Sequence, residues 1–203
     1  MAIKLIIGIG NPDLPAGRQA NEYQNTRHNV GFMLVDQIAN PSTKLRTGKN
    51  DFGDFKLDKY SNSLISKGKI DGSTVILTKP QTYVNKSGEA VKKLTVNYKL
   101  KTENLLVIQD DLDVPFGNTK ISFDKNSGGH KGIESIMKAL KTKKFYRLRI
   151  GLATTGLKKA RLQSDKKRDE YVVKMVLSKF TPSEQEQIKS IFKEGYEKIL
   201  QLL

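Results

Sequence analysis

The stretch KLIIGIGNP, residues 4–12, contains the feature that decides the fold. Lys4–Ile9 is a short apolar run of residue types that favour strands, and its closing glycines lead directly to Asn11. Such a run, ending in a turn and a polar side chain, is typical of a buried strand in an α/β sheet. The G-I-G pair is similar to the start of a dinucleotide-binding fingerprint, but Asp13 stands where that fingerprint needs its third glycine.

Further apolar, β-rich runs alternate with stretches of helical period along the rest of the chain. Strands are expected at Thr74–Leu77, Leu105–Ile108, Lys120–Phe123 and Tyr146–Leu152, with weaker candidates at Phe52–Lys59 and Ser63–Lys69. Apolar residues at three- and four-residue steps predict helices within Val30–Ile38, Val91–Tyr98 and Ile133–Leu140. This alternation predicts an α/β fold, namely a single domain with a mixed, largely parallel central sheet and helices on both faces.

The last helix has the clearest start signal. Thr181 offers an N-cap hydroxyl, Pro182 suits the first helical position, and Glu184 can reach back to the cap. The apolar positions that follow mark one buried face: Ile188, Ile191, Phe192, Ile199 and Leu203. Two stretches look instead like surface loops, Asp13–Ala20 and the Lys- and Arg-rich Thr154–Asp169.

Composition excludes several classes of site. The 203 residues suit one domain and contain no cysteine, which removes disulfides, thiolate metal sites and cysteine nucleophiles. Two histidines are too few for a three-histidine zinc site. The apolar run Leu5–Ile7 is far shorter than the ~20 residues that a membrane span needs. We therefore expect no membrane association, and the lack of cysteine suits a cytoplasmic location.

The net charge of +15 points to a polyanionic partner. The excess is clustered, because residues 138–174 hold nine Lys, four Arg and only three acidic residues. A merely solvated surface is the alternative, but clustering favours nucleic acid.

Polar residues at the predicted element ends form the candidate site. They are Asn11, His28, Asn29, Asn85, Asp110 and the run from Gly128 to Lys131. Taken singly, each can be a cap or turn residue. In an open α/β sheet, however, ligands bind at the carboxyl ends of the strands, where Asn11 and Asp110 are expected. No phosphate-binding G-x-x-x-x-G-K-[ST] loop and no G-x-S-x-G elbow is present, so nucleotide and serine-hydrolase chemistry are not indicated.

Longer motifs follow one another along the chain: GIGNP (8–12), EYQNTRHNVG (22–31), KPQTYVNKSG (79–88), DDLDVPFG (110–117), GGHKG (128–132) and FYRLRIG (145–151). Together they resemble the motifs of the bacterial-type peptidyl-tRNA hydrolases, in the family's order and over nearly the whole chain. The resemblance implies one domain, residues 1–203, that cleaves the ester between a peptide and the terminal ribose of tRNA. It also implies a monomer that needs no cofactor and no metal.

The resemblance assigns a role to each motif position. His28 is implied to be the catalytic base and Asp110 its partner, and Asn11 is implied to distinguish blocked from free aminoacyl groups. Residues implied to bind the junction of tRNA and peptide are Tyr23, Tyr83, Asn85 and Lys131. The sequence departs from the family pattern at Lys131, where Asn is usual, and at Val84, where Met is common. Loop insertions are expected near residues 13–20 and 154–169.

The chemistry of these residues suits ester hydrolysis. A neutral imidazole is the natural base near pH 7, and a carboxylate on its other ring nitrogen holds the tautomer and stabilises the imidazolium. Asn85 is the expected donor to the oxyanion or to the attacking water. The basic region, with Lys143, Lys144 and Arg149 as its candidates, is expected to bind tRNA phosphates without reading sequence.

Two other functions compete with this interpretation. A non-catalytic RNA-binding member of the same fold, an RNA-processing factor, would keep the basic surface without needing the catalytic set. A hydrolase or phosphorylase acting on small peptides or nucleosides would not need a clustered positive charge. Lys131 also leaves two expectations open: it pairs with Glu134 on the surface, or it points into the cleft.

Overall fold

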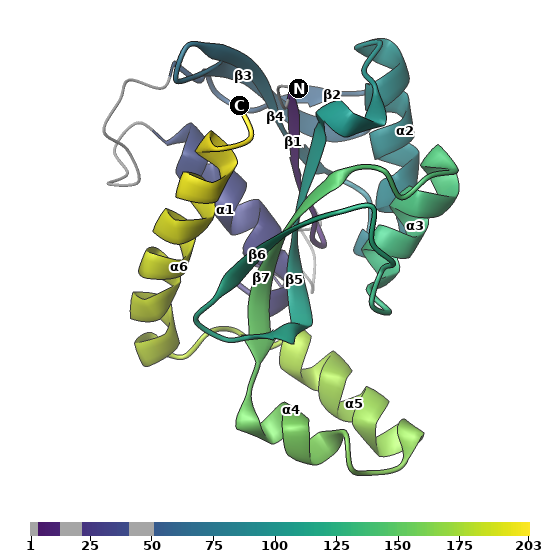
Figure 1. The fold of residues 1–203 in the computed structure, drawn as a ribbon, viewed down its shortest axis with the longest axis vertical. Helices are drawn as coiled ribbons and strands as arrows, with labels where there is room; N and C mark the ends of the chain where they lie inside the picture. The colour runs from purple at the N-terminus through teal and green to yellow at the C-terminus, as the bar shows by residue number, and fades with distance from the viewer. Residues whose placement is uncertain (1–3, 13–21, 41–50) are drawn as a thin grey trace.

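The computed structural model describes residues 4–12, 22–40 and 51–203. Its strands form one seven-stranded sheet in the order β2-β3-β4-β1-β5-β7-β6 (Figure 1). The strand bounds are β1 Leu5–Gly8, β2 Lys56–Asp58, β3 Ser63–Ile70, β4 Ser73–Pro80, β5 Leu105–Pro115, β6 Thr119–Phe123 and β7 Tyr146–Ala153. Every strand predicted from the sequence is present.

The sheet is parallel at its centre and antiparallel at both edges. Strands β4, β1, β5 and β7 run parallel to one another, whereas β2, β3 and β6 join the sheet through antiparallel pairs. Leu5 lies between Ile76 of β4 and Leu105 of β5, so the run quoted first is the middle of the sheet. The predicted mixed, largely parallel sheet is confirmed.

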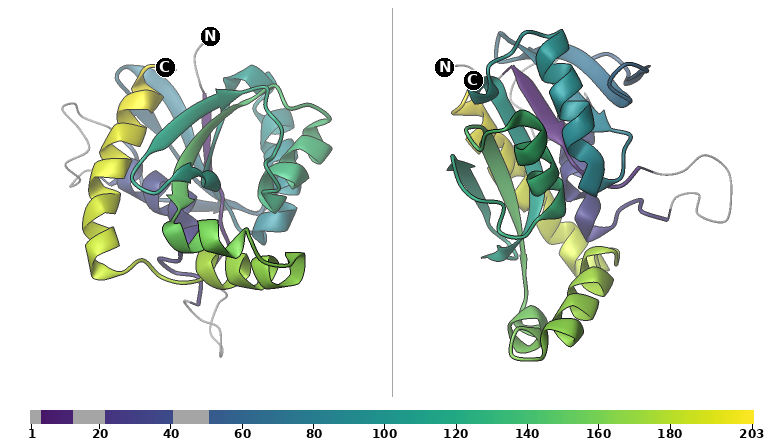
Figure 2. Two further views of the ribbon diagram at one scale, coloured as in Figure 1. Left: turned by 60° about the horizontal axis from the view of Figure 1, so that its bottom comes forward. Right: turned by 90° about the vertical axis from the view of Figure 1, so that its right-hand side faces the viewer.

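Helices cover both faces of the sheet, as predicted (Figures 1 and 2). Their bounds are α1 Val30–Ala39, α2 Ser87–Asn97, α3 Lys131–Leu140, α4 Thr155–Ala160, α5 Asp165–Val176 and α6 Pro182–Leu200, with 3-10 turns η1 Arg27–Asn29, η2 Val84–Lys86 and η3 Thr102–Asn104. Successive strand residues point to opposite faces, so Ile6 packs in the core under α1 and α6, whereas Leu5 and Ile7 pack under α2 and α3.

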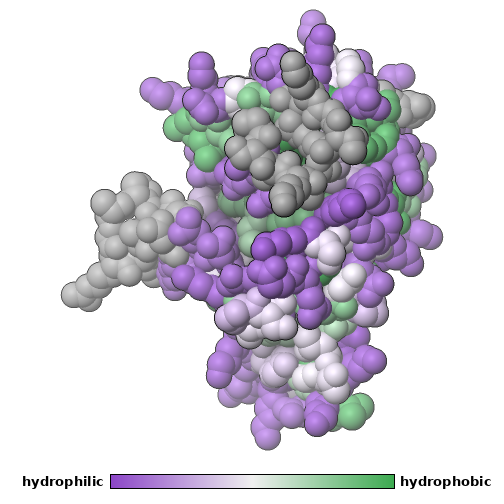
Figure 3. Space-filling model, turned by 90° about the vertical axis from the view of Figure 1, so that its left-hand side faces the viewer, coloured by the Kyte–Doolittle hydropathy of each residue, from purple (hydrophilic) through white to green (hydrophobic). Residues whose placement is uncertain are grey.

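Helix α6 begins as the sequence predicts. The Thr181 hydroxyl accepts from the Glu184 N–H, and the Glu184 carboxylate accepts from the Thr181 N–H, so both bonds of a capping box form. Outside the grey atoms, the side of the molecule that carries α1 and α6 is mainly hydrophilic (Figure 3). Among the described helices, none combines the length and the apolarity that crossing a bilayer requires.

A close approach between α1 and the sheet sets the position of η1. A Cβ on Gly31 would lie 2.5 Å from the Ile108 carbonyl oxygen and 2.7 Å from that of Ile9. Because glycine lacks this atom, the start of α1 lies directly against β5 and the end of β1. The turn η1, which precedes α1 and carries His28, is therefore held at the carboxyl end of β1.

The expectation of a surface loop over Thr154–Asp169 was wrong. This stretch contains α4 and the start of α5, and both helices project from the rest of the molecule (Figure 2). The Thr154 hydroxyl caps α4, and Leu157 and Ala160 are buried. Because lysine and arginine dominate this stretch, its few buried apolar residues do not form a recognisable helical period in the sequence. The other expected loop, Asp13–Ala20, lies outside the described residues.

Candidate active site

His28 and Asp110 come together as the sequence suggested. The Nδ1 atom of His28, in η1, lies 2.8 Å from Oδ1 of Asp110, in β5. The Asp110 residue is 2% exposed, so its carboxylate is held away from bulk water. A carboxylate on Nδ1 assigns the proton to that nitrogen and leaves a lone pair on Nε2, the arrangement that a general base needs.

The sequence predicts that Asp110 follows the end of its strand. In the structure Asp110 lies within that strand. Strand β5 continues to Pro115, and Asp110 pairs in register with Ile150 of β7. The strand continues because β7 also continues beside it, so backbone pairing extends past the apolar run that ends at Ile108. Asp110 is therefore fixed by strand pairing instead of by a turn.

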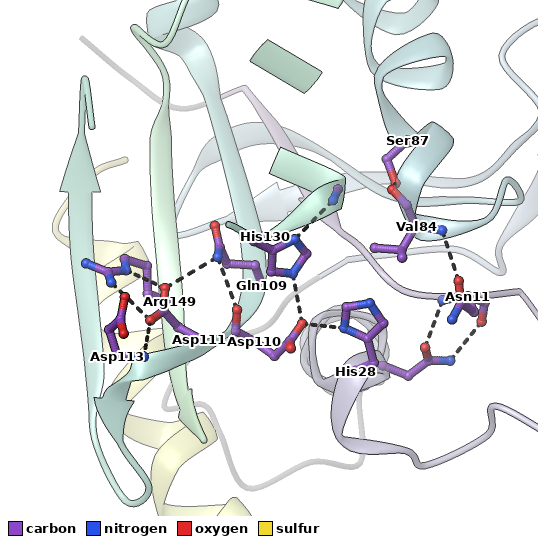
Figure 4. A network of polar contacts seen from close by, with 12 residues as sticks. Asn11, His28, Val84, Ser87, Gln109, Asp110, Asp111, Asp113, His130 and Arg149 are labelled. Atoms are coloured by element: carbon purple, nitrogen blue, oxygen red, sulfur yellow. Dashed lines mark hydrogen bonds and ion pairs between the residues drawn. The ribbon is translucent and has the colours of Figure 1, made fainter. Parts of the chain in front are cut away.

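A second histidine, His130, contacts the same carboxylate oxygen. Its Nε2 lies 3.0 Å from Asp110 Oδ1, and its Nδ1 accepts a hydrogen bond from the Gly132 N–H at 3.1 Å. His130 is thus the N-cap of α3, and its tautomer is assigned by the backbone donor. With Nδ1 accepting, Nε2 carries the proton and donates to Asp110 (Figure 4).

The electrostatics follow from these contacts. Burial alone would raise the pKa of Asp110, but the charges and hydrogen bonds of His28 and His130 outweigh it and hold that pKa well below its ordinary range. Burial alone would lower the pKa of His28, but the Asp110 carboxylate outweighs it and raises that pKa above 6.5. Asp110 is therefore ionised at neutral pH, and it stabilises the protonated form of His28.

The same three residues have the spacing of a cation site. The ligand atoms of His28, Asp110 and His130 lie within 4.8 Å of one another. Binding a metal through these atoms would require a lone pair on His130 Nε2, and hence a proton on His130 Nδ1. The Gly132 N–H already donates to that Nδ1, so the observed contacts favour hydrogen bonds over metal ligation.

Asn11 lies in a separate hydrogen-bonded group on the other side of His28 in the view of Figure 4. Its backbone N–H donates to Asn29 Oδ1, and Asn29 Nδ2 donates to its carbonyl, both at 2.8 Å. Its side-chain Oδ1 accepts from the Val84 N–H at 3.0 Å. The predicted residues Asn11 and His28 are thus linked through consecutive residues of η1.

The other predicted substrate contacts lie around this group. Asn85 is exposed on η2, and Tyr83, immediately before this turn, is 42% exposed. The pKa of Tyr23 is raised by burial and by the nearby Glu22 and Tyr83. The Lys131 ammonium lies 3.1 Å from Glu134 and its side chain is 74% exposed, which fits the surface-pair expectation, but Lys131 also lines the cleft that contains the two histidines.

The predicted phosphate-binding residues fall into two groups. Lys143 and Lys144 are exposed between α3 and β7. Arg149 is half-buried and engages Asp111 with two hydrogen bonds, of 2.6 and 3.0 Å. The bond to Asp111 raises the pKa of Arg149. Arg149 is therefore already neutralised, whereas the two lysines are open to an external anion.

A cleft of about 230 Å³ joins the histidine pair to helix α5. Its lining includes His28, Asp110 and His130, the glycines Gly128 and Gly129, and three valines of α5: Val172, Val173 and Val176. A larger hollow of about 760 Å³ lies between α1 and α6, but its described lining contains no histidine or carboxylate. The smaller cleft therefore has the chemistry for proton transfer.

Residues 5–203 match the family model described as "Peptidyl-tRNA hydrolase". The chain belongs to the peptidyl-tRNA hydrolase family. The peptidyl-tRNA hydrolase of Aquifex aeolicus is 40% identical over 96% of this chain and 87% of its own, and that of Thermodesulfovibrio yellowstonii is 36% identical over 98% and 91%. The crystal structure of the Acinetobacter baumannii peptidyl-tRNA hydrolase covers 98% of this chain and 88% of its own, with 32% identity and a TM-score of 0.79.

His130 is the residue whose part in the peptidyl-tRNA hydrolase site the sequence did not reveal. The sequence indicates it only as part of the candidate run from Gly128 to Lys131 and assigns it no role. The available signal was a histidine just before a helix of strong apolar period, at an N-cap position. Its contact with Asp110, 20 residues away, depends on the tertiary structure.

Proposed function

We propose that this protein hydrolyses the ester bond between a peptide, or an N-blocked amino acid, and the 3′-terminal ribose of tRNA, which releases tRNA for translation. The observation that carries the proposal is the His28–Asp110 pair in a chain that matches the peptidyl-tRNA hydrolase family over residues 5–203. The products are a free peptide and a tRNA with an intact 3′ end.

His28 is the general base in this proposal. Its Nε2 takes a proton from water as the water oxygen attacks the ester carbonyl. The Asp110 carboxylate stabilises the imidazolium that forms, and the raised pKa of His28 reflects that stabilisation. The protonated His28 then returns the proton to the leaving 3′-oxygen of the ribose. His130 acts through Asp110, because it shares the oxygen that orients His28.

The two asparagines supply neutral hydrogen-bond donors. Asn85 is exposed on η2 and stabilises the oxyanion or positions the water. The Oδ1 atom of Asn11 is occupied by the Val84 N–H, so its Nδ2 is the group that remains to bind substrate. An N–H donor suits the acyl carbonyl of a blocked amino group, whereas a free α-ammonium offers only donors. This difference accounts for a preference for blocked substrates.

The exposed Lys143 and Lys144 bind phosphates of the tRNA in this proposal. Contacts of this kind give affinity without sequence specificity, as an enzyme that accepts every tRNA requires. Arg149 contributes only where a phosphate displaces Asp111. We also infer a monomer that acts in the cytoplasm, where tRNA is reused, without a resident metal or cofactor. An RNA-binding protein without activity would have no use for the His28–Asp110 pair.

The decisive experiment is hydrolysis of N-acetylaminoacyl-tRNA by the purified protein. His28→Ala is expected to lower kcat/KM by about 10²–10⁴-fold, the usual contribution of a general base, while tRNA binding is retained. A variant that kept more than about a tenth of the activity would show that His28 is not the base. A wild-type protein that bound tRNA without hydrolysis would support the RNA-binding alternative.

A further inference from the structure

Asn29 is buried beside the catalytic His28, and among the described residues its side chain bonds only to the backbone of Asn11. It is 5% exposed, and both of its hydrogen bonds are 2.8 Å long. One bond uses the amide as an acceptor and the other uses it as a donor. The Asn29 side chain therefore bonds to both the backbone N–H and the backbone carbonyl of Asn11, which is 18 positions away in the chain.

The hydrogen bonds continue from Asn11 to the turn that carries Asn85. Asn11 Oδ1 accepts from the Val84 N–H, and the Val84 carbonyl accepts from the Ser87 hydroxyl at 2.8 Å (Figure 4). Asn11, Val84 and Ser87 are all less than 9% exposed. Because each link is buried, water does not readily replace a bond that is lost.

We propose that Asn29 is the positioning residue that sets the orientation of Asn11 and thereby the selectivity for N-blocked substrates. This inference rests on the function proposed above. Consecutive residues of η1 then have separate tasks: His28 activates water with Asp110, and Asn29 positions the group that recognises the blocked amino end. The two tasks meet only in the backbone of η1.

The chemistry explains why orientation decides selectivity. With Oδ1 held by Val84, Asn11 presents the donor Nδ2, which has no protein partner among the described residues. A rotation of Asn11 would present its oxygen instead, and an oxygen accepts from a free α-ammonium. Loss of the Asn29 bonds is therefore expected to reduce discrimination by more than it reduces hydrolysis of the blocked substrate.

The test uses variants that fit the available space. A Cβ on Gly10 would lie 2.7 Å from Asn29 Oδ1, so a larger side chain at position 29 would clash. Asn29→Asp keeps the shape and can accept from the Asn11 N–H, but its carboxylate cannot donate to the Asn11 carbonyl. Asn29→Ser is smaller and neutral. Thr26→Val is the matched control, because Thr26 lies immediately before η1 and is 1% exposed. Its hydrogen bonds among the described residues go to the Tyr23 and Asn29 backbones, and it pairs with Lys179 in an isolated bridge.

The measurement is kcat/KM for N-acetylaminoacyl-tRNA and for the matching aminoacyl-tRNA, with the acidic limb of the pH profile for the blocked substrate. Both Asn29 variants are expected to lower the ratio of the two kcat/KM values on the order of tenfold. The acidic limb should stay in place, because Asp110 still faces His28. Thr26→Val should retain the wild-type ratio.

A double-mutant cycle with Asn11→Ala tests whether Asn29 acts through Asn11. The effect of Asn29→Ser on the ratio should disappear in the Asn11→Ala background. Additive effects, or an unchanged ratio in a folded Asn29→Ser or Asn29→Asp protein, would overturn the inference. A parallel loss on both substrates with a displaced acidic limb would also overturn it, since η1 would then have moved as a whole. If the wild type hydrolyses neither substrate, the proposed function itself fails.

Discussion

Replacing Asp110 with asparagine separates the charge of this carboxylate from its role in holding the His28 tautomer. In a triad with one histidine, the amide can turn its NH₂ group toward the imidazole, and the resulting wrong tautomer costs about 10⁴-fold in rate. Here the Gly132 N–H donates to Nδ1 of His130, so His130 always presents Nε2–H to position 110. An asparagine is therefore expected to keep its oxygen toward both histidines, which preserves the His28 tautomer.

The expected loss in Asp110→Asn is then electrostatic only. Two unit charges about 4 Å apart interact by about 4 kcal/mol at an effective dielectric constant of about 20. The amide oxygen still accepts from both rings and recovers part of this energy. A loss of about 3 kcal/mol of imidazolium stabilisation corresponds to roughly 10²-fold in kcat/KM.

The pH dependence has a defined sign. Asp110 raises the pKa of His28 against the effect of burial, so removing the charge leaves only burial, which lowers that pKa. The acidic limb of kcat/KM should move to lower pH in Asp110→Asn. Because the pKa of His28 is raised on folding, its interaction with Asp110 stabilises the fold fully below pH 6.5, and this stabilisation is lost as pH rises through the raised pKa of folded His28. Because the pKa of Asp110 is lowered on folding, its ionised form stabilises the fold above about pH 3.9. The free energy of unfolding of Asp110→Asn should therefore fall furthest below that of the wild type between about pH 3.9 and pH 6.5.

The assay compares Asp110→Asn, His130→Ala and the double variant on N-acetylaminoacyl-tRNA across pH. Without His130, the asparagine is free to turn, so the double variant should approach the 10⁴-fold loss expected of a wrong tautomer. His130→Asn is the control that retains an N-cap side chain on α3. A 10⁴-fold loss in Asp110→Asn alone, with no further loss in the double variant, would refute the reasoning.

Other predictions concern the tRNA surface, the cleft rim and the packing of α1. Reversing the charges of Lys143 and Lys144 should flatten the plot of log tRNA affinity against log salt and spare hydrolysis of a minimal peptidyl-adenosine; equal losses on both substrates would contradict a separate phosphate surface. Lys131→Asn should leave the acidic limb of kcat/KM unchanged, because an exposed ammonium paired with Glu134 is well screened; a limb moved to higher pH would mean that Lys131 acts on His28. Gly31→Ala should destabilise the fold by about 1–3 kcal/mol and lower kcat, because its methyl would clash with the Ile9 and Ile108 carbonyls. Gly53→Ala is the control: a Cβ on Gly53 has no atom within 4 Å, so stability and kcat should both stay at the wild-type level.

Local patterns in the sequence were sufficient for the strands, for most of the helices and for several residues of the candidate site. Alternating strand and helix periods predict the α/β sheet, because burial on one or both faces directly constrains which residues repeat. The capping box at Thr181 could be recognised because all its atoms lie within four residues. His28 and Asp110 could be proposed as a pair from the chemistry of their side chains and their places in known motifs. The basic stretch, by contrast, was misread as a loop, because surface lysines say little about backbone conformation.

Tertiary structure alone decided which polar groups share a bond. Asp110 meets His28 from 82 positions away and also accepts from His130, whose proton is placed by a backbone N–H of α3. Asn29 meets Asn11, and Arg149 is bound by Asp111 instead of being free for phosphate. Each of these contacts depends on distances of about 3 Å between elements that are remote in the chain. Sequence periodicity specifies which face a residue occupies, but only the packed elements bring one donor to one acceptor.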